Sequence, residues 1–415
     1  MADDLFTPLR LASGAVLPNR IAKAAMEESL AGPGQLPDRR LFTLYRSWAD
    51  GGTGLLITGN VMVHAEALTG AGGVVLDAAA PLEPFAEWAA AAKSGGAAVW
   101  MQINHPGRQV PSGMPGVVWG PSDLAVDVGR HSGRFSRPTA MTDRQIAATV
   151  ERFATTSRRA AEAGFDGVEI HAAHGYLLSQ FLSPLVNTRT DDWGGSPANR
   201  ARLLLDVVRA VRAAVPARFA VAVKINSADF QRGGFDADDA RQVIELLAPL
   251  GVDLVELSGG SYESPAMTGR PADGRTRARE AYFRDLAADL VRTSPLPLML
   301  TGGITRRGTA EQVLADGVAV VGIGTALAVT PDLPHRWAAA GEAEQALRPV
   351  TWSDRTLASA AAMALVRRQM RRLADGRTPT PRTRPAVALL AELREQRKAV
   401  RRYRGWLDGR GPEAA

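Results

Sequence analysis

A short segment of the chain, HAAHGY, brings together two histidines and a tyrosine: His171, His174 and Tyr176. Two histidines three residues apart face the same way if the backbone turns helically between them. Their ring N–H groups can then bind a carbonyl or phenolate oxygen and stabilise negative charge on it, while the tyrosine hydroxyl supplies a proton. The segment therefore predicts a site for chemistry at a polarised oxygen.

These histidines are also compatible with two different roles. They can serve a structural purpose, as histidines that cap a turn. They can also bind zinc, but no third ligand is evident and the four-residue spacing of metalloprotease histidines is absent.

Two polar residues lie in otherwise apolar runs: Gln102 lies near the end of AVWMQI, and Lys224 lies in AVAVKIN. A carboxamide can both donate to and accept from the edge of a heteroaromatic ring. A buried lysine can stabilise a negative charge. Each is equally consistent with an ordinary polar residue near a strand end.

Glycines follow the last two apolar runs of the chain. Gly302 and Gly303 come after one, and Gly324, with Thr325 beside it, comes after the other. Glycines there let backbone amides approach a phosphate, and the loops after strands seven and eight form the usual phosphate site of a (β/α)8 barrel. Each glycine pair by itself is explained by a turn, but both together favour a cofactor that carries a phosphate.

Eight short apolar runs can position these residues. Most are continuous rather than alternating, as is typical of strands buried on both faces, and helical patterns lie between most of them. Eight such strands predict a (β/α)8 TIM barrel. The alternative, a doubly wound sheet, is disfavoured because it usually has a glycine fingerprint after its first strand, where this chain reads AMEES. The runs are Arg20–Ala24, Leu55–Gly59, Ala98–Ile103, Asp166–His171, Ala220–Asn226, Asp253–Ser258, Pro297–Thr301 and Val318–Gly322.

Helix signals support this alternation. Thr142 and Gln145 have the spacing of a capping box, an amphipathic helix follows, and Gly164 ends it just before the run DGVEIH. A second such unit begins at Asp236 and leads into VDLVELS.

Composition excludes several functional classes. The 415 residues include no cysteine, so disulfides, thiolate zinc sites, cysteine nucleophiles and cysteine-bound iron–sulfur clusters are excluded. No apolar run reaches the roughly 18 residues that a membrane span needs. The opening MADDLFTPLR lacks the order of a signal peptide, so we expect a cytoplasmic protein.

The positive charge is concentrated near the C-terminus. The chain carries a net +6, but residues 351–415 carry +9 and the remainder −3. We expect a barrel in residues 1–340 and a basic helical extension in residues 341–415, with helices near 351–373 and 386–403 joined by an extended Pro/Thr/Arg segment. Because the body is not basic and no recognition motif is present, we expect no nucleic-acid partner.

From Leu5 to Trp337 the chain resembles the old yellow enzyme family of FMN-dependent NAD(P)H oxidoreductases. The most specific stretch is GFDGVEIHAAHGYLLSQFLSPLVNTRTDDWGGSPANR, from Gly164 to Arg200. The resemblance implies a (β/α)8 barrel that holds FMN over the strand ends, NAD(P)H as reductant, a small-molecule substrate and a homo-oligomer.

The resemblance also implies roles for individual residues. His171 and His174 would hold the substrate oxygen, and Tyr176 would protonate the α-carbon of an activated C=C bond while flavin N5 gives hydride to the β-carbon, in a ping-pong cycle. The residues that would bind FMN are Ala25 and Met26 at the first strand end, Gly59 and Asn60 at the second, Gln102 at the pyrimidine edge, Lys224 near N1 and O2, and Gly302, Gly303, Gly324 and Thr325 near the phosphate.

Four positions depart from the family pattern. Glu27 replaces a Thr or Cys, Lys224 and Thr325 each replace an Arg, and Ser29 stands where an aromatic residue is common. A carboxylate at position 27 would repel an anionic reduced flavin, act as a base, hold a cationic substrate, or turn away into a salt bridge. The alternative function is therefore dehydrogenation, desaturation or amine oxidation on the same fold, with the flavin reoxidised by oxygen or a partner.

Overall fold

The computed structural model describes residues 4–264, 284–339 and 346–410, and its centre is a closed parallel barrel. Eight strands form it in the order of the chain, and the pairing of β4 with β6 completes the circle beside β3. All eight coincide with the predicted runs, so the (β/α)8 fold is confirmed. The strands are β3 (Ile21–Lys23), β4 (Leu55–Ile57), β6 (Ala98–Asn104), β9 (Gly167–Ala172), β10 (Ala220–Asn226), β11 (Leu254–Ser258), β12 (Leu298–Thr301) and β13 (Val320–Ile323).

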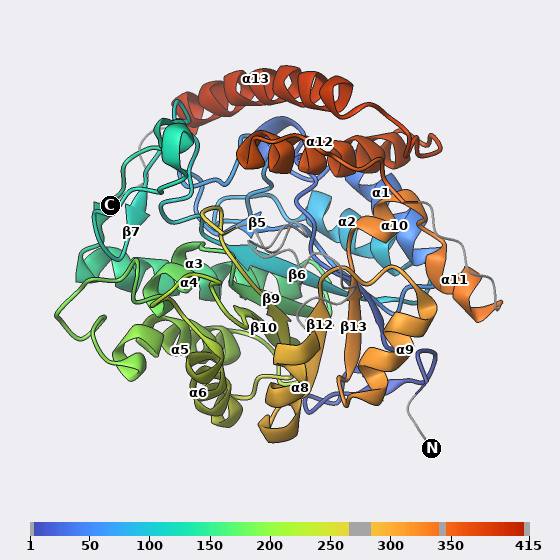
Figure 1. Cartoon of the computed structure of the whole chain (residues 1–415), viewed down its shortest axis with the longest axis horizontal. Helices are drawn as coiled ribbons and strands as arrows, with labels where there is room; N and C mark the ends of the chain where they lie inside the picture. Colours follow the sequence, from blue (N-terminus) through green and yellow to red (C-terminus); the bar gives the residue numbers. More distant parts are fainter. Residues whose placement is uncertain (1–3, 265–283, 340–345, 411–415) are drawn as a thin grey trace.

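Helices surround the barrel and cover the outward faces of its strands (Figure 1). Both predicted helix starts are confirmed, because Thr142 with Gln145 and Asp236 with Asp239 form capping boxes. The helices are α1 (Arg39–Ala49), α2 (Glu83–Lys93), α3 (Asp143–Glu162), α4 (Leu177–Leu182), α5 (Pro197–Ala214), α6 (Ala237–Leu247), α8 (Arg284–Thr293), α9 (Arg307–Ala315), α10 (Thr325–Val329) and α11 (Leu333–Ala338), with short 3-10 turns at Pro33–Gln35, Gly129–Arg134 and Ala248–Leu250.

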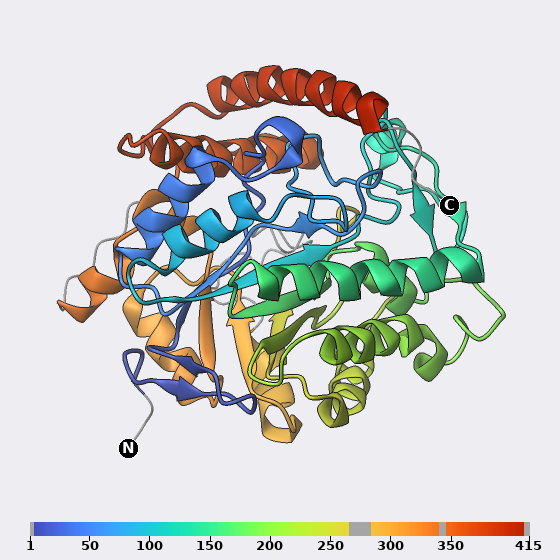
Figure 2. The ribbon, with the colours of Figure 1, turned by 180° about the vertical axis from the view of Figure 1, so that it is seen from behind.

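Short strands lie outside the barrel. β1 (Leu9–Arg10) and β2 (Val16–Leu17) form a hairpin at the end of the barrel opposite the C-terminal helices, as both ribbon views show (Figures 1 and 2). β5 (Val61–Met62) extends the sheet beside β6, and β7 (Trp119–Gly120) pairs with β8 (Thr139–Ala140).

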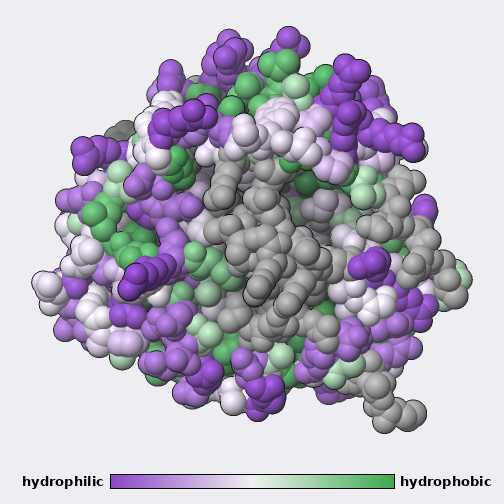
Figure 3. Space-filling model, in the orientation of Figure 1, coloured by the Kyte–Doolittle hydropathy of each residue, from purple (hydrophilic) through white to green (hydrophobic). Residues whose placement is uncertain are grey.

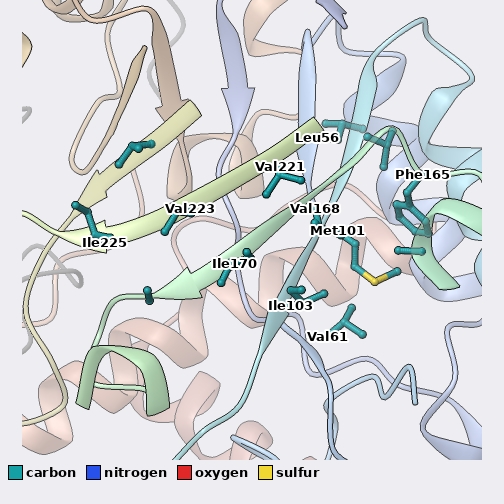
Figure 4. Close-up of a cluster of buried hydrophobic side chains, with 14 of the residues drawn as sticks. Leu56, Val61, Met101, Ile103, Phe165, Val168, Ile170, Val221, Val223 and Ile225 are labelled. Carbon is teal, nitrogen blue, oxygen red and sulfur yellow. The ribbon is translucent and has the colours of Figure 1, made fainter. Parts of the chain in front are cut away.

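Side chains of the barrel strands alternate between two environments. Val168 and Ile170 of β9 lie beside Val221 and Val223 of β10 in the layer between strands and helices (Figure 4). The intervening residues face the interior of the barrel, since successive side chains of a strand point to opposite faces. That interior is apolar at the bottom, with Trp100 among its residues, and becomes polar toward the C-terminal ends of the strands.

Two helices complete the chain: α12 (Arg355–Ala374) and α13 (Pro385–Arg410), joined by a non-helical segment. Both predicted helices are confirmed, although α13 continues seven residues beyond the predicted Tyr403. They lie one above the other across the end of the barrel (Figures 1 and 2). The predicted boundary at residues 340–341 falls outside the described residues.

The C-terminal helices pack on the barrel of their own chain. α12 contacts α1 and α10, and Met370 and Leu373 join the main hydrophobic core. Tyr403 of α13 is buried among residues of the loop after β5 and donates a hydrogen bond of 2.8 Å to the backbone oxygen of Ala65. The apolar contacts show that the helix pair is part of the folded body. In the part of the chain that the structure describes, no helix is both long and apolar enough to cross a membrane.

Candidate active site

A cavity of about 2010 Å³ opens at the C-terminal ends of the barrel strands and extends beneath α12. Pockets for one small molecule usually measure about 300–1,000 Å³, so this cavity has room for a cofactor and a substrate together. All but one of the site residues expected from the sequence line it: Ala25, Met26, Glu27, Asn60, Gln102, His171, His174, Tyr176, Lys224, Gly302, Gly303, Gly324 and Thr325.

His171, His174 and Tyr176 come together at the end of β9. The ring centroids of His171 and His174 are 5.0 Å apart, and those of His171 and Tyr176 are 4.9 Å apart, both edge to face. The two histidines come together without a helical turn between them. His171 lies near the end of the strand, and His174 takes a left-handed backbone conformation with φ of 60°.

Hydrogen bonds fix the orientation of both imidazoles. The backbone N–H of Ala173 donates to Nδ1 of His171 at 3.2 Å, so the proton of a neutral His171 ring is on Nε2. Nε2 of His174 lies 2.7 Å from Oγ of Ser258, which leaves Nδ1 for another partner. Burial, aided by the charge of Lys224, lowers the pKa of His174 to about 3, and burial likewise holds the pKa of His171 well below its usual value. Both rings are therefore neutral near pH 7.

Tyr262 is a site residue that the sequence interpretation missed. It follows β11, and its hydroxyl lies 3.1 Å from the hydroxyl of Tyr176. Burial is the main cause that raises the pKa of Tyr262 to about 12 and the pKa of Tyr176 well above its usual value, so both phenols stay protonated at neutral pH. Its position just after the run VDLVELS, at a strand end, was the only signal in the sequence.

Buried charges form a polar layer beneath these aromatic residues. Strand register places Lys224 beside both His171 and Glu256, and its Nζ lies 2.7 Å from Oε1 of Glu256. Gln102 donates from Nε2 to Oε2 of Glu169 at 2.6 Å. Burial and the neighbouring Glu256 raise the pKa of Glu169, whereas Lys224 lowers that of Glu256 against the effect of burial. Lys224 is therefore balanced by one carboxylate, and Gln102 keeps its Oε1 for a ligand.

Glu27 is paired with a residue from the C-terminal extension. Its Oε2 accepts from the guanidinium of Arg367 on α12, and its Oε1 accepts from the Thr69 hydroxyl at 2.8 Å. Arg367 also contacts Glu392 of α13 at 3.1 Å. Of the alternatives for Glu27, the structure shows the salt bridge.

Gly59 is the one expected site residue that lies behind the cavity wall. Its backbone N–H donates to Glu28 at 3.1 Å and to the Tyr45 hydroxyl at 3.0 Å. Lys23 completes this buried network with hydrogen bonds of 3.1 Å to Tyr45 and 2.7 Å to the backbone oxygen of Ile57. Burial lowers the pKa of Lys23 to about 8. The network supports the strand ends that carry Met26 and Asn60.

The glycines expected at the phosphate line one side of the cavity. Gly302 and Gly303 have φ of 139° and 69°, conformations that favour glycine and leave the backbone accessible. Gly324 and Thr325 lie next to them across the β12–β13 pair. A glycine-lined end, an amide at Gln102 and a cation at Lys224 fit the phosphate and the heteroaromatic ring of FMN. Within the described ranges no group of acidic or histidine residues is placed to hold a metal ion.

Comparison with known proteins agrees with this geometry. The sequence model of the NADH:flavin oxidoreductase / NADH oxidase family matches residues 4–344. The NADH-dependent flavin oxidoreductase iliE of Hypocrea jecorina is 38% identical over a match of 349 residues, and the match covers 79% of this chain and 87% of that protein.

Solved structures give the same result. An old yellow enzyme homologue from Zymomonas mobilis matches with a TM-score of 0.70 and 26% identity, covering 83% of this chain and 95% of that one. Morphinone reductase in complex with tetrahydroNAD matches with a TM-score of 0.68 and 26% identity, covering 82% and 92%.

The fold and these matches define the class of the protein, a flavin-dependent oxidoreductase. More narrowly, the chain belongs to the NADH:flavin oxidoreductase / NADH oxidase family, the old yellow enzyme family, as the sequence resemblance indicated. Its cofactor is FMN and its reductant is a reduced nicotinamide.

Proposed function

We propose that this enzyme reduces the activated C=C bond of an enone-like substrate with electrons from NAD(P)H. When bound, FMN would supply the hydride transfer from the nicotinamide to the β-carbon of the substrate. The protein must then stabilise negative charge on the carbonyl oxygen and deliver a proton to the α-carbon. The nicotinamide and the enone use the same cavity in turn, so we expect ping-pong kinetics.

The donor at His171 is the observation that carries this proposal. Because Nδ1 accepts from the Ala173 N–H, the ring presents Nε2–H, and His174 offers Nδ1 from the same cavity wall. If Nδ1 of His174 carries its proton, the two neutral rings would donate to one substrate oxygen and stabilise the charge that develops there, in the manner of an oxyanion hole. Their lowered pKa values keep them neutral, so the charge on the substrate oxygen is met by hydrogen bonds rather than by proton transfer.

Tyr176 is the proposed proton donor. Its ring packs against His171, the proposed oxygen-binding group, and its raised pKa keeps the phenol protonated at neutral pH. The hydroxyl of Tyr262 lies 3.1 Å from that of Tyr176, and we expect it to return a proton to Tyr176 after turnover. General acid catalysis of this kind contributes about 10²–10⁴-fold to a rate.

Amine oxidation finds little support in this site. That alternative depended on a free carboxylate at Glu27 to hold a cation. The carboxylate is instead matched by Arg367 and Thr69. The reverse reaction, dehydrogenation of a saturated ketone, uses the same groups and differs only in the potential of the partner substrates.

Anaerobic absorbance spectroscopy tests the proposal in two halves. The flavin spectrum should bleach with NADH or NADPH and return when cyclohexenone is added. Tyr176→Phe should bleach at the wild-type rate but recover about 100-fold more slowly, as expected for loss of a general acid. A flavin that bleaches and is not reoxidised by cyclohexenone or any other enone contradicts enone reduction, and equal losses in both halves contradict the role of Tyr176.

We also propose that the lining residues named above hold FMN, as the family resemblance implies. We propose in addition that residues 1–340 form the barrel and residues 341–415 the extension, and that the protein forms a homo-oligomer. The pairing of Lys224 with Glu256 and of Gln102 with Glu169 supports the first, because it orients both side chains at the cavity floor.

A further inference from the structure

The C-terminal extension lies beyond the family match but still lines the active-site cavity. The family model ends at residue 344, whereas α12, α13 and the segment before α12 all contribute lining residues. Some of these residues are apolar, such as Ala360, Met363 and Val366 of α12, and many of the others are arginines. The extension therefore adds positive charge to a cavity that the barrel alone would form.

The arginines of the extension that line the cavity fall into two groups. Arg367 and Arg371 are 12% and 16% exposed, and they form ion pairs with Glu27 and Glu392. For the second group, no carboxylate among the described residues forms an ion pair. These arginines are Arg348, before α12, and Arg397, Arg401 and Arg402 of α13.

The carboxylates that line the cavity do not balance this second group. Each of them already accepts from an arginine, a lysine or a backbone N–H group. Nine arginine and lysine side chains line the cavity against six carboxylates, and six of the nine cations but only two of the carboxylates belong to the extension. The surplus of positive charge therefore lies at the extension and favours an anion there. The six carboxylates are Glu27, Asp38, Asp127, Glu263, Glu392 and Glu395.

Three of the unpaired arginines lie within six residues of one helix. Arg397 and Arg401 are one helical turn apart on α13, so their side chains are neighbours, and Arg402 follows directly. All three are exposed, and the edge of the space-filling view along α13 carries hydrophilic residues with a few hydrophobic ones among them (Figure 3). Arg348 lies apart from them, because its backbone N–H donates to Pro381 just before α13 begins.

These arginines are some distance from the reacting groups. Arg367 connects the two regions, since it pairs with Glu27 in the active site and with Glu392 on α13. Arg397 and Arg401 follow Glu392 by five and nine residues, about 7.5 and 13.5 Å along the helix at about 1.5 Å per residue. A ligand that reacts in the active site and also contacts these arginines must therefore be long and must carry its negative charge away from the reacting ring. A nicotinamide dinucleotide has this form.

We propose that Arg397, Arg401 and Arg402 bind the phosphate groups of the reduced nicotinamide dinucleotide while its nicotinamide ring lies in the active site. A guanidinium group presents paired N–H donors that match the oxygens of a phosphate. Exposed ion pairs of this kind are individually weak, so the oxidised dinucleotide can leave before the second substrate enters. The inference depends on the nicotinamide reductant and not on the reduction of an enone.

An equilibrium titration with tetrahydroNADH tests this binding without turnover. This analogue cannot donate a hydride, so the change in flavin absorbance reports its binding alone. The triple variant Arg397→Gln/Arg401→Gln/Arg402→Gln should raise its Kd about tenfold, as expected for the loss of several exposed ion pairs. Higher ionic strength should raise the Kd of the wild type more than that of the triple variant, because salt screens exposed charges.

Arg394→Gln is the matched control. Arg394 is an exposed arginine of the same helix, but it is not among the residues that line the active-site cavity. We expect its substitution to leave the Kd for tetrahydroNADH unchanged. Flavin content and melting temperature show that each variant is folded and loaded.

A reductant without phosphates separates the phosphate contacts from those of the nicotinamide ring. In anaerobic stopped-flow experiments, N-benzyl-dihydronicotinamide should reduce the flavin of the triple variant at the wild-type rate, whereas half-saturation with NADH should need about tenfold more reductant. Equal losses with both reductants overturn the inference, because the arginines would then affect the flavin or the ring.

The remaining outcomes are equally decisive. An unchanged Kd for tetrahydroNADH in the triple variant overturns the inference and leaves an anionic group of the second substrate as the occupant. A loss in Arg394→Gln as large as in the triple variant overturns it as well, since net surface charge alone would then explain the effect. If the triple variant behaves as expected but the wild type reduces no enone, the inference stands and the proposed enone reduction fails.

Discussion

Arg367 of α12 donates to the carboxylate of Glu27, although 340 positions separate the two residues in the sequence. The pair is largely buried, with side chains 12% and 15% exposed. Burial alone would lower the pKa of Arg367, but Glu27 and Glu392 raise it, so the guanidinium remains charged. The C-terminal extension thus supplies the countercharge for an acidic residue that lines the active-site cavity.

Breaking this pair should be costly. Arg367→Met leaves Glu27 without its countercharge, and removal of one partner of a buried ion pair costs about 3–5 kcal/mol of the free energy of unfolding. The double variant Arg367→Met/Glu27→Gln should regain most of that loss, because no unpaired carboxylate remains at position 27. Urea denaturation of the three proteins measures both effects.

A surface pair provides the control. Arg336 and Asp332, four residues apart and 44% and 46% exposed, form an ordinary helical salt bridge. Arg336→Met should cost only about 0.3–0.5 kcal/mol. Equal losses for Arg367→Met and Arg336→Met, or a double variant no more stable than Arg367→Met, would contradict the importance of the buried pair.

The barrel could be predicted from the sequence, whereas the ion pair of Arg367 and Glu27 could not. Strand runs and the capping boxes at Thr142 and Asp236 are local, and each is decided by neighbouring residues. Most of the site residues follow from the barrel, because its strands bring their C-terminal ends to one place. His171 and Lys224 could therefore be assigned to one site from the sequence.

Contacts that depend on folding at long range were not predictable in this way. The sequence showed that the extension was basic, but not which arginine meets Glu27. Tyr262 carries no motif of its own, and only the loop after β11 brings it to Tyr176. Gly59 was assigned to the flavin from the family resemblance alone, and the sequence did not show that its backbone N–H is bound by the Lys23–Glu28–Tyr45 network rather than lining the cavity.

The two site histidines should make the fold sensitive to acid. In the unfolded chain their pKa is about 6.5, whereas burial lowers the pKa of folded His174 to about 3 and that of His171 well below normal. Below about pH 6.5 these histidines are protonated in the unfolded chain but remain neutral in the folded protein. The free energy of unfolding therefore falls by about 1.4 kcal/mol for each such histidine with each unit by which the pH is lowered. Above about pH 6.5 the histidines are neutral in both states, and this loss of stability is absent.

Urea titrations at several pH values between 7.5 and 5 check this dependence. His174→Asn removes one of the two groups and should make the slope shallower over that range. His335→Asn, at an exposed position on α11, is the control and should leave the slope unchanged. A slope that is the same for wild type and His174→Asn would show that His174 does not remain neutral in the folded protein.

Tyr262 should influence only the second half of the proposed reaction. Tyr262→Phe removes the hydroxyl 3.1 Å from Tyr176, which leaves the general acid in place but without its partner. We expect flavin reduction by NADH to be unchanged and reoxidation by cyclohexenone to slow about tenfold, less than the 10²–10⁴-fold range for loss of a general acid. Stopped-flow absorbance separates the two steps; a loss as large as that of Tyr176→Phe would instead make Tyr262 the donor.

Gly59 should tolerate no side chain, although it does not line the cavity. A Cβ there would lie 1.9 Å from Oε2 of Glu28 and 2.5 Å from the backbone oxygen of Met26. Gly59→Ala must therefore displace the Glu28 network and the strand end that carries Met26, at a cost of about 1–3 kcal/mol for overpacking. Because Met26 lines the proposed flavin site, the purified variant should also retain less FMN per chain.

Gly308 is a suitable control for this substitution. It lies in the first turn of α9 with no atom within 4 Å of an added Cβ, so Gly308→Ala should leave FMN content unchanged and stabilise the protein by about 0.4–1 kcal/mol, through the unfolded chain. Melting temperature and the flavin-to-protein absorbance ratio after gel filtration measure both quantities. If Gly59→Ala has a lower melting temperature but full FMN content, the Glu28 network stabilises the fold and does not contribute to FMN binding. If Gly59→Ala behaves like Gly308→Ala, the close approach of Glu28 and Met26 to Gly59 does not affect stability or FMN binding.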